Sequence, residues 1–308
     1  MKDNLLVIVG PTAVGKTGLS LDIATRFNGE IISGDSMQVY KGLDIGTAKI
    51  SPEEMRGVKH HLINCYEPDY DFSVAEFQDI VQKSIVEINR KNKLPILVGG
   101  TGLYIKSVTN KYNFSQVKRD NDYREHLSQY NNDILYTKLN EVDPLTASKI
   151  HINDTKRILR ALEVYHLSGK PASELLVDQD REIPYNLLII GLIRNRAELY
   201  NQINLRVDNM INQGLVEEVK SLLASGYNEK YNSMQGLGYK EINKYLKGEI
   251  SLEHAIFLIK QGTRRYAKRQ LSWFRQIEEI HWFDLTDSRD NNKEKNINNI
   301  FDLIAGKF

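Results

Sequence analysis

The chain has 308 residues, of which 41% are hydrophobic and 26% charged, so it is long enough for one large globular domain or two smaller ones. Its 41 Lys and Arg against 40 Asp and Glu give a formal net charge of +1, which excludes a surface that is basic throughout. The single cysteine, Cys65, excludes an intramolecular disulfide and a cysteine-based zinc site. We expect a buried, inert thiol in a reduced, cytoplasmic protein. We also expect no signal peptide and no membrane span, because no apolar run approaches about 18 residues.

The first predicted strand, residues 5–9, runs into a glycine-containing loop and then a helical pattern over residues 18–24. This order is typical of a P-loop, in which backbone N–H groups converge on a phosphate at a helix N-terminus. Lys16 would reach the terminal phosphates, and the Thr17 hydroxyl would bind Mg²⁺. Taken alone, the loop predicts nucleotide binding, ATP included, without saying which phosphate compound it holds. The residues of the loop are Gly10, Pro11, Thr12, Ala13, Val14, Gly15, Lys16 and Thr17.

Two later strands end in polar groups that would lie beside this loop. Residues 29–36 predict a strand that ends near Asp35, and residues 94–98 predict a buried strand followed by two glycines and Thr101. Ligands bind beyond the carboxyl ends of parallel strands, which favours a functional Asp35 over a turn or helix cap. Many P-loop NTPases carry an acid where the two glycines stand, so its absence weakens an ATPase assignment. An acid and a hydroxyl here suit deprotonating and positioning an acceptor.

The segments between these strands are less specific. Residues 37–49 are polar and interrupted by glycines, which predicts a loop that lines a site. Adjacent His60 and His61 have no acidic or cysteine partner at metal-binding spacing, so we expect them to pack structurally. Residues 72–90 predict an amphipathic helix that begins with a capping box.

From Lys111 the composition becomes polar and rich in Asn, Tyr and Lys, with helical patterns and no convincing buried strand. A strand pattern resumes at residues 187–192. We therefore predict an α/β protein with a P-loop NTPase-like parallel sheet flanked by helices. Its core domain comprises residues 1–112 and 185–308, and an inserted helical subdomain comprises residues 113–184.

Basic residues gather on two predicted helices, and Arg196 lies just past a strand end, close to where a phosphate would lie. The cations on the helix at 154–168 fit a nucleic-acid contact and a solvated face equally well. Six cations without an acidic residue between 260 and 275, interleaved with aromatic side chains, favour a nucleic-acid phosphate backbone. After Asp284 we expect a polar stretch and a last small helix from about Ile297. The two sets of cations are Lys156, Arg157 and Arg160, and Lys260, Arg264, Arg265, Lys268, Arg269 and Arg275.

Together these motifs resemble the bacterial tRNA dimethylallyltransferase family, also called tRNA isopentenyltransferases. The matching stretches lie in the family order and span nearly the whole chain. The P-loop is shared by many families, whereas residues 34–38 and 267–270 are much more specific. The stretches are residues 10–17, 33–40, 43–49, 60–63, 98–104, 153–164, 236–241 and 263–274.

The resemblance implies transfer of a dimethylallyl group from dimethylallyl diphosphate to N6 of the adenosine 3′-adjacent to the anticodon of tRNA, giving N6-isopentenyladenosine. The P-loop, Lys16, Mg²⁺ and Arg196 would then hold the diphosphate leaving group. Asp35 would accept the amine proton, and Thr101 would hydrogen-bond the amine. The helical insertion and the basic segment 263–275 would bind the anticodon stem-loop through its shape and its phosphates. The target base would be flipped out of the loop. The implied tRNA-binding residues are Asp35, Ser36, Met37, Gln38, Thr101, Arg124, Lys156, Arg157, Arg160, Gly236, Lys240, Arg264, Arg265, Lys268 and Arg269.

Three positions depart from the family pattern. Gln202 stands where many relatives carry Arg, Val14 where Ser is common, and Asn64 where Asp is frequent. Two alternatives remain open at this point: a small-molecule or nucleotide kinase that uses Asp35 as its base, and a non-catalytic nucleotide-dependent RNA-binding protein. We expect a monomer, although the sequence leaves the oligomeric state, the tRNAs used and nucleotide competition at the P-loop open.

Overall fold

A six-stranded parallel sheet forms the centre of the computed structural model, which describes residues 2–110, 120–175, 183–286 and 292–308. The strand order is β3-β2-β4-β1-β5-β6, and every neighbouring pair is parallel. The predicted P-loop-like sheet flanked by helices is confirmed. The strands are β1 (Asn4–Val9), β2 (Gly29–Ser33), β3 (His60–His61), β4 (Leu94–Gly99), β5 (Asn186–Ile193) and β6 (Ile280–Asp284).

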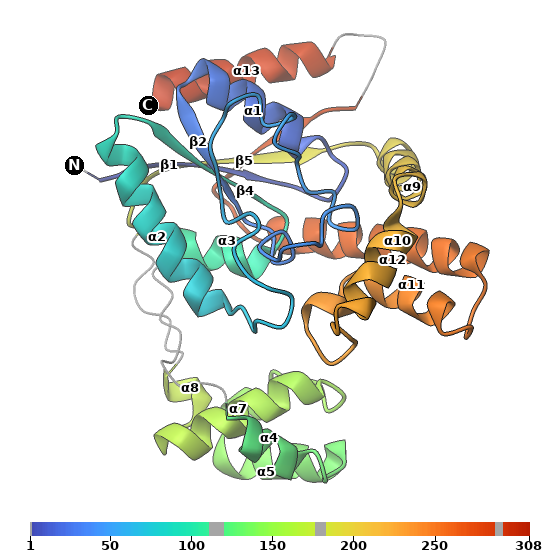
Figure 1. Cartoon of the computed structure of the whole chain (residues 1–308). Helices are drawn as coiled ribbons and strands as arrows, with labels where there is room; N and C mark the ends of the chain where they lie inside the picture. The colour runs from blue at the N-terminus through green and yellow to red at the C-terminus, as the bar shows by residue number, and fades with distance from the viewer. Residues whose placement is uncertain (1, 111–119, 176–182, 287–291) are drawn as a thin grey trace. The chain divides into compact units, whose positions relative to one another are not determined.

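Both faces of this sheet are covered by helices, which explains the continuous apolar run of β1. Successive side chains of a strand point to opposite faces. Accordingly Leu5 and Val7 pack in one core with α2 (Val74–Arg90) and α3 (Gly102–Thr109). Leu6 and Ile8 pack in a second core with α1 (Lys16–Arg26) and α13 (Asn292–Lys307). In Figure 1, α1 and α13 lie on one side of the sheet, and α2 and α3 lie on the other.

Helix α2 forms as its sequence predicts. The Ser73 hydroxyl accepts from the Glu76 N–H at 3.2 Å, and the Glu76 carboxylate accepts from the Ser73 N–H at 3.0 Å, which completes the capping box. Its inward stripe includes Phe77, Val81 and Ile85, all fully buried. The helix therefore begins at a cap and is held by packing against the sheet.

The edge strand β3 contains the two adjacent histidines, and each has a hydrogen-bond partner within the fold. The His61 Nε2 lies 2.8 Å from the Glu30 carboxylate, and the His60 Nδ1 lies 2.9 Å from the Val58 carbonyl. The prediction of a buried thiol was wrong, because Cys65 is exposed. It follows a strand of only two residues at the sheet edge, where little structure is available to cover it.

Four further helices pack against one another. Helix α9 contacts α10 and α12, and α11 contacts both α10 and α12. A short 3₁₀ turn, η1 (Ser233–Gln235), precedes α11. The helices are α9 (Arg196–Asn212), α10 (Leu215–Ala224), α11 (Tyr239–Leu246) and α12 (Leu252–Phe274).

The chain divides into two compact units, Met1–Asn110 with Ile183–Phe308, and Lys111–Glu182. The second unit is helical and has its own core, in which Leu139, Ile158 and Leu162 are buried. Within the described residues, no helix combines the length and apolar character that a bilayer crossing requires. The last helix is longer than predicted and begins at Asn292. The helices of the second unit are α4 (Asn121–Leu127), α5 (Asn132–Val142), α6 (Pro144–Ala147), α7 (Thr155–Ser168) and α8 (Ala172–Leu175).

Candidate active site

The loop between β1 and α1 has the backbone conformation of a phosphate cradle. Gly10, Ala13 and Gly15 all have positive φ, of 148°, 63° and 110°. A Cβ atom at Gly10 would lie 2.6 Å from the Leu192 carbonyl oxygen, so this turn requires glycine. Helix α1 begins after Gly15 without a side-chain cap or an acid in its first turn. Its first N–H groups and its dipole therefore favour an anion at this end.

Lys16 folds back over the loop. Its ammonium donates to the Gly10 and Pro11 carbonyl oxygens at 2.9 and 2.8 Å. Burial and the nearby Arg206 guanidinium lower the pKa of Lys16 from 10.5 to about 7, although the Asp35 carboxylate acts in the opposite direction. Two cations and one acid thus share a site where a phosphate compound would add the missing negative charge.

Gln270 of α12 ties the phosphate loop to the end of β4. Its side-chain oxygen accepts from the Thr12 N–H at 2.9 Å, and its side-chain nitrogen donates to the Gly100 carbonyl at 2.9 Å. A Cβ atom at Gly100 would lie 2.1 Å from that nitrogen, so glycine is required there. Gly100 therefore makes room for this buried amide, whereas Gly99 is required by the close backbone of Gly34, whose carbonyl oxygen a Cβ atom would approach to 2.6 Å.

Asp35 and Thr101 are placed at the ends of β2 and β4, as predicted from strand order. One Asp35 oxygen accepts from the Met37 N–H at 2.8 Å, so the residue also closes a turn. Thr101 is the N-cap of α3 but makes no capping bond with its side chain. Its side chain instead interacts with Tyr266. Burial and, to a smaller extent, the Asp35 carboxylate raise the pKa of Tyr266. The hydrogen bonds of Tyr266 with Thr101 and Gln270 act in the opposite direction and lower that pKa.

A pocket of about 600 Å³ joins these groups. Its wall includes the phosphate loop, the end of β2, the glycines after β4 and one face of α9. Thr101 does not line the pocket itself, although the adjoining Gly100 does. Outside the phosphate loop, its polar lining side chains include Ser33, Asp35, Gln38, Gln202, Arg206, Asn209, Gln213, Tyr266 and Gln270.

The arginine that enters the pocket is not Arg196. Arg196 is exposed at the start of α9, where its guanidinium lies over the Tyr200 ring at 5.2 Å, and it does not line the pocket. Arg194 contacts the phosphate loop by donating to the Val14 carbonyl at 3.1 Å and pairs with Glu198. Arg206 lines the pocket, where burial lowers its pKa and Asp35 opposes that shift.

The part of the chain that the structure describes contains no cluster of three or more His, Cys, Asp or Glu residues that could hold a metal ion. Thr17, however, contributes to the pocket wall next to Lys16. A cation here would have to be held by Thr17, by water and by oxygens of a bound phosphate. Mg²⁺ suits such a site, because it keeps several waters and is often shared with substrate phosphates.

Residues 38–277 match the family model described as IPP transferase. The chain belongs to the IPP transferase family. A protein of Anoxybacillus flavithermus named tRNA dimethylallyltransferase is 50% identical over 308 residues, covering 100% of this chain and 98% of that relative. The crystal structure of a full-length tRNA isopentenylpyrophosphate transferase from Bacillus halodurans is 48% identical, with a TM-score of 0.75, and covers 99% of this chain and 97% of that one.

A structure from the eukaryotic branch extends the likeness. It belongs to a dimethylallyltransferase described as acting on tRNA, is 32% identical and has a TM-score of 0.85. The alignment covers 99% of this chain and 80% of that chain. These names support a prenyltransferase of the IPP transferase family over a kinase.

Two departures from the family pattern can now be placed. Asn64 has a left-handed backbone, φ 54°, which asparagine tolerates, and its side-chain oxygen accepts from the Lys49 ammonium at 2.6 Å. Its role is therefore to partner a buried lysine. Gln202 lines the pocket on the same face of α9 as Arg206, so an arginine there would add a third cation close to Lys16.

The predicted base-contacting residues lie in the segment that follows β2. Gln38 lines the pocket, and its side chain joins Ser33 and the Thr47 carbonyl at 2.9 and 3.3 Å. Met37 packs against Gly236, where a Cβ atom would lie 2.8 Å from its methyl carbon. Ser36 is half-buried beside Met37.

The cations of α12 divide between two faces. Lys260 pairs with Asp208, and Arg264 donates to the Asn204 side chain at 2.7 Å, so both engage α9. The opposite face is solvent-accessible, with a groove of about 370 Å³ between α11 and α12 and a neighbouring one of about 550 Å³. The basic residues of these grooves are Lys240, Lys244, Arg265, Lys268 and Arg269, and the half-exposed Trp273 lies among them.

In the helical unit, two of the arginines predicted to contact tRNA, Arg124 and Arg160, pair with a buried acid. Arg124 makes two hydrogen bonds, of 2.7 and 2.8 Å, to the fully buried Glu163, and Arg160 makes a third at 2.6 Å. Burial favours the neutral acid, but these bonds outweigh it and lower the pKa of Glu163 to about 2. A buried carboxylate requires such partners, so both arginines stabilise the unit. Lys156 and Arg157 are exposed.

Proposed function

We propose that this chain transfers a dimethylallyl group from dimethylallyl diphosphate to N6 of the adenosine 3′-adjacent to the anticodon of tRNA. The observation that carries the proposal is one pocket in which Lys16, Arg206 and the phosphate loop face Asp35, while β4 ends in glycine and threonine. Such a site can hold a diphosphate and accept a proton from an attacking amine. It lacks the β4 acid that would favour hydrolysis.

In this reaction the bond between the allylic carbon and the diphosphate oxygen breaks as the bond from N6 to that carbon forms. The N–H groups of the loop, with Lys16 and Arg206, neutralise the charge that develops on the leaving diphosphate. Asp35 accepts the proton that N6 loses. Thr101 orients the amine, and Tyr266 in turn holds the Thr101 side chain.

We propose that Mg²⁺ binds with the diphosphate, because Thr17 lies in the pocket wall and the ligand itself supplies the remaining oxygens. Bound there, the ion would withdraw charge from the leaving group. Thr17 positions it, while Lys16 acts on the terminal phosphate. Asp35 stays available as a base.

We propose that the tRNA lies against the grooves of α11 and α12, with Arg265, Lys268 and Arg269 on its phosphates. Trp273 offers an aromatic surface in the same place. The target base must be flipped to reach Asp35, and we assign its contacts to Ser36, Met37 and Gln38. These assignments put the RNA phosphates and the donor on different faces of α12, with the flipped base reaching the donor pocket.

We further propose that residues 113–184 form a second tRNA-binding element, through Lys156 and Arg157, which are exposed. We propose that the enzyme acts as a monomer in the cytoplasm. Sedimentation of the chain with and without tRNA tests the oligomeric state. A dimer in the absence of tRNA would overturn that part.

The function is tested by incubating the chain with Mg²⁺, dimethylallyl diphosphate and unmodified tRNA. The tRNA is then digested, and its nucleosides are identified by mass spectrometry. We expect N6-isopentenyladenosine among the nucleosides, formed more slowly by about 100-fold or more with the Asp35→Asn variant. Phosphate transfer from ATP to a small acceptor, with no mass added to tRNA, would instead establish the kinase.

A further inference from the structure

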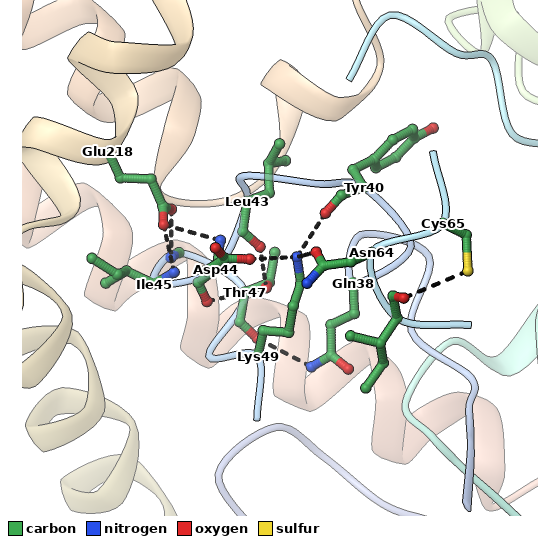
Figure 2. A network of polar contacts seen from close by, with 12 residues as sticks. Gln38, Tyr40, Leu43, Asp44, Ile45, Thr47, Lys49, Asn64, Cys65 and Glu218 are labelled. Carbon is green, nitrogen blue, oxygen red and sulfur yellow. Dashed lines mark hydrogen bonds and ion pairs between the residues drawn. The ribbon is translucent and has the colours of Figure 1, made fainter. Parts of the chain in front are cut away.

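The loop from Gln38 to Lys49 carries a network of polar contacts that holds one wall of the pocket (Figure 2). The Thr47 carbonyl is its inner end, because it accepts from the Gln38 side chain and from the Arg206 guanidinium, each at 3.3 Å. Both donors line the pocket. The position of the Thr47 carbonyl therefore influences where two side chains lie: Gln38, which we assign to the target base, and Arg206, which we assign to the diphosphate.

Arg206 needs such a partner. Lys16 shares the pocket, and the repulsion between the two cations is strong enough to contribute to the lowered pKa of Lys16. Without a fixed acceptor, the Arg206 guanidinium would gain by moving away from Lys16 toward solvent. Its hydrogen bond to the Thr47 carbonyl opposes that movement.

The loop is fixed from outside by a single carboxylate on α10. Glu218 accepts from three successive backbone N–H groups, those of Asp44, Ile45 and Gly46, at 3.0, 2.7 and 3.0 Å. It also accepts from the Tyr239 hydroxyl at 2.6 Å. Figure 2 shows the Glu218 side chain reaching the loop, with dashed lines to its backbone. Three converging N–H groups form a nest for an anion, and hydrogen bonds to a charged acceptor are stronger than neutral ones.

A second contact closes the other side of the loop. The Lys49 side chain is 3% exposed, and its ammonium donates to the Tyr40 carbonyl, Asp44 and Asn64 at 2.6 to 2.7 Å. The loop is thus clamped between Lys49 and Glu218, and Thr47 lies between these two anchor points in sequence. Gly46 lies against the Tyr239 ring, where a Cβ atom would come within 2.5 Å, so the loop has no room to shift toward α11.

We propose that Glu218 is a positioning residue for the transfer reaction, and that through the backbone of residues 44–47 it holds Arg206 and Gln38 in the donor pocket. This inference rests on the proposed function. Glu218 itself touches neither substrate. Without the Glu218 carboxylate the loop can move, and the Thr47 carbonyl no longer holds the Arg206 guanidinium close to Lys16.

The test compares steady-state kinetics of prenyl transfer in the Glu218→Ala and Glu218→Gln variants. Loss of an outer partner that orients a metal ligand typically costs 10- to 100-fold, and by analogy we expect Glu218→Ala to raise the donor KM about tenfold. Glu218→Gln keeps an oxygen for the Asp44 and Ile45 N–H groups and should recover much of this loss. Glu218→Gln also keeps the test possible if the alanine variant does not fold.

Two control variants separate positioning from stability. Glu217→Gln alters the exposed neighbour, which lies 3.8 Å from Lys220, and should leave the kinetics unchanged. Val219→Ala removes methyl groups from a fully buried side chain of the same helix, so it should lower the melting temperature without raising the donor KM. An unchanged donor KM in Glu218→Ala, or an equal rise in Val219→Ala, would overturn the inference. An inactive wild-type chain would instead overturn the proposed function.

Discussion

The lowered pKa of Lys16 predicts that donor binding takes up a proton. With a pKa of about 7, half of the free protein carries a neutral amine at pH 7, although the bound diphosphate requires the ammonium. Diphosphate next to the amine raises its pKa again, so the complex is protonated where the free protein is not. The affinity for dimethylallyl diphosphate must then fall as the pH rises above about 7.

The size of the effect follows from that value. Between pH 7 and pH 8.5 the ammonium fraction of free Lys16 falls about 16-fold, and the dissociation constant should rise by the same factor, equivalent to about 1.6 kcal/mol. At pH 8 each binding event should take up about 0.9 proton. The terminal phosphate of the donor has a pKa near 6, so its own ionisation is almost complete in this range.

Calorimetry in two buffers of different ionisation enthalpy measures the proton uptake directly, with Mg²⁺ present and tRNA omitted. The Lys16→Arg variant is the matched control, because arginine stays charged and should bind with nearly constant affinity over the same range. A wild-type affinity that does not change between pH 7 and pH 8.5, with no proton taken up at pH 8, would refute the reasoning.

Three other perturbations test separate parts of the structure. Asp35→Asn should lower kcat by about 100-fold or more and leave the donor affinity within about threefold, because it removes a base rather than a phosphate contact; an equal loss of affinity would argue against that role. Replacing Arg265 and Arg269 by Ala should raise the KM for tRNA and flatten its dependence on salt, with the donor KM unchanged. Glu163→Gln should destabilise the helical unit by about 3 kcal/mol, seen as faster amide exchange in α7. Because the folded pKa of Glu163 is lowered to about 2, its contribution is complete above the unfolded pKa near 4.5 and is lost as the pH falls toward 2, so wild-type exchange should accelerate there more than that of the variant.

The sequence was sufficient to predict where strands end, and hence that Asp35 lies near the phosphate loop. It misassigned the arginine, because Arg196 seemed best placed at the end of β5. Its side chain lies over Tyr200, and the pocket is lined instead by the face of α9 that carries Gln202, Arg206 and Asn209. These residues recur at spacings of four and three, so helical periodicity could have found Arg206 had a pocket on that face been suspected.

A similar limit applies to the basic helix. Composition marked residues 260–275 as one cationic surface, whereas Lys260 and Arg264 turn toward α9 and Gln270 reaches the phosphate loop. Which face of a helix meets a partner depends on tertiary packing that charge counts do not contain. In the helical unit, Glu163 is one acid on an otherwise apolar stripe of α7. That position could have predicted that nearby arginines form ion pairs within the unit.

The bond from Gln270 to Thr12 also bears on how the protein is made. The two residues are 258 positions apart, so the N-terminal loop emerges from the ribosome long before the amide that closes it. At about 5 to 20 residues per second, the interval is about 13 to 52 s. During that time the nascent chain has its phosphate-binding sequence but not the bond that joins it to β4. The connection between the phosphate loop and the end of β4 is therefore completed only when α12 is in place.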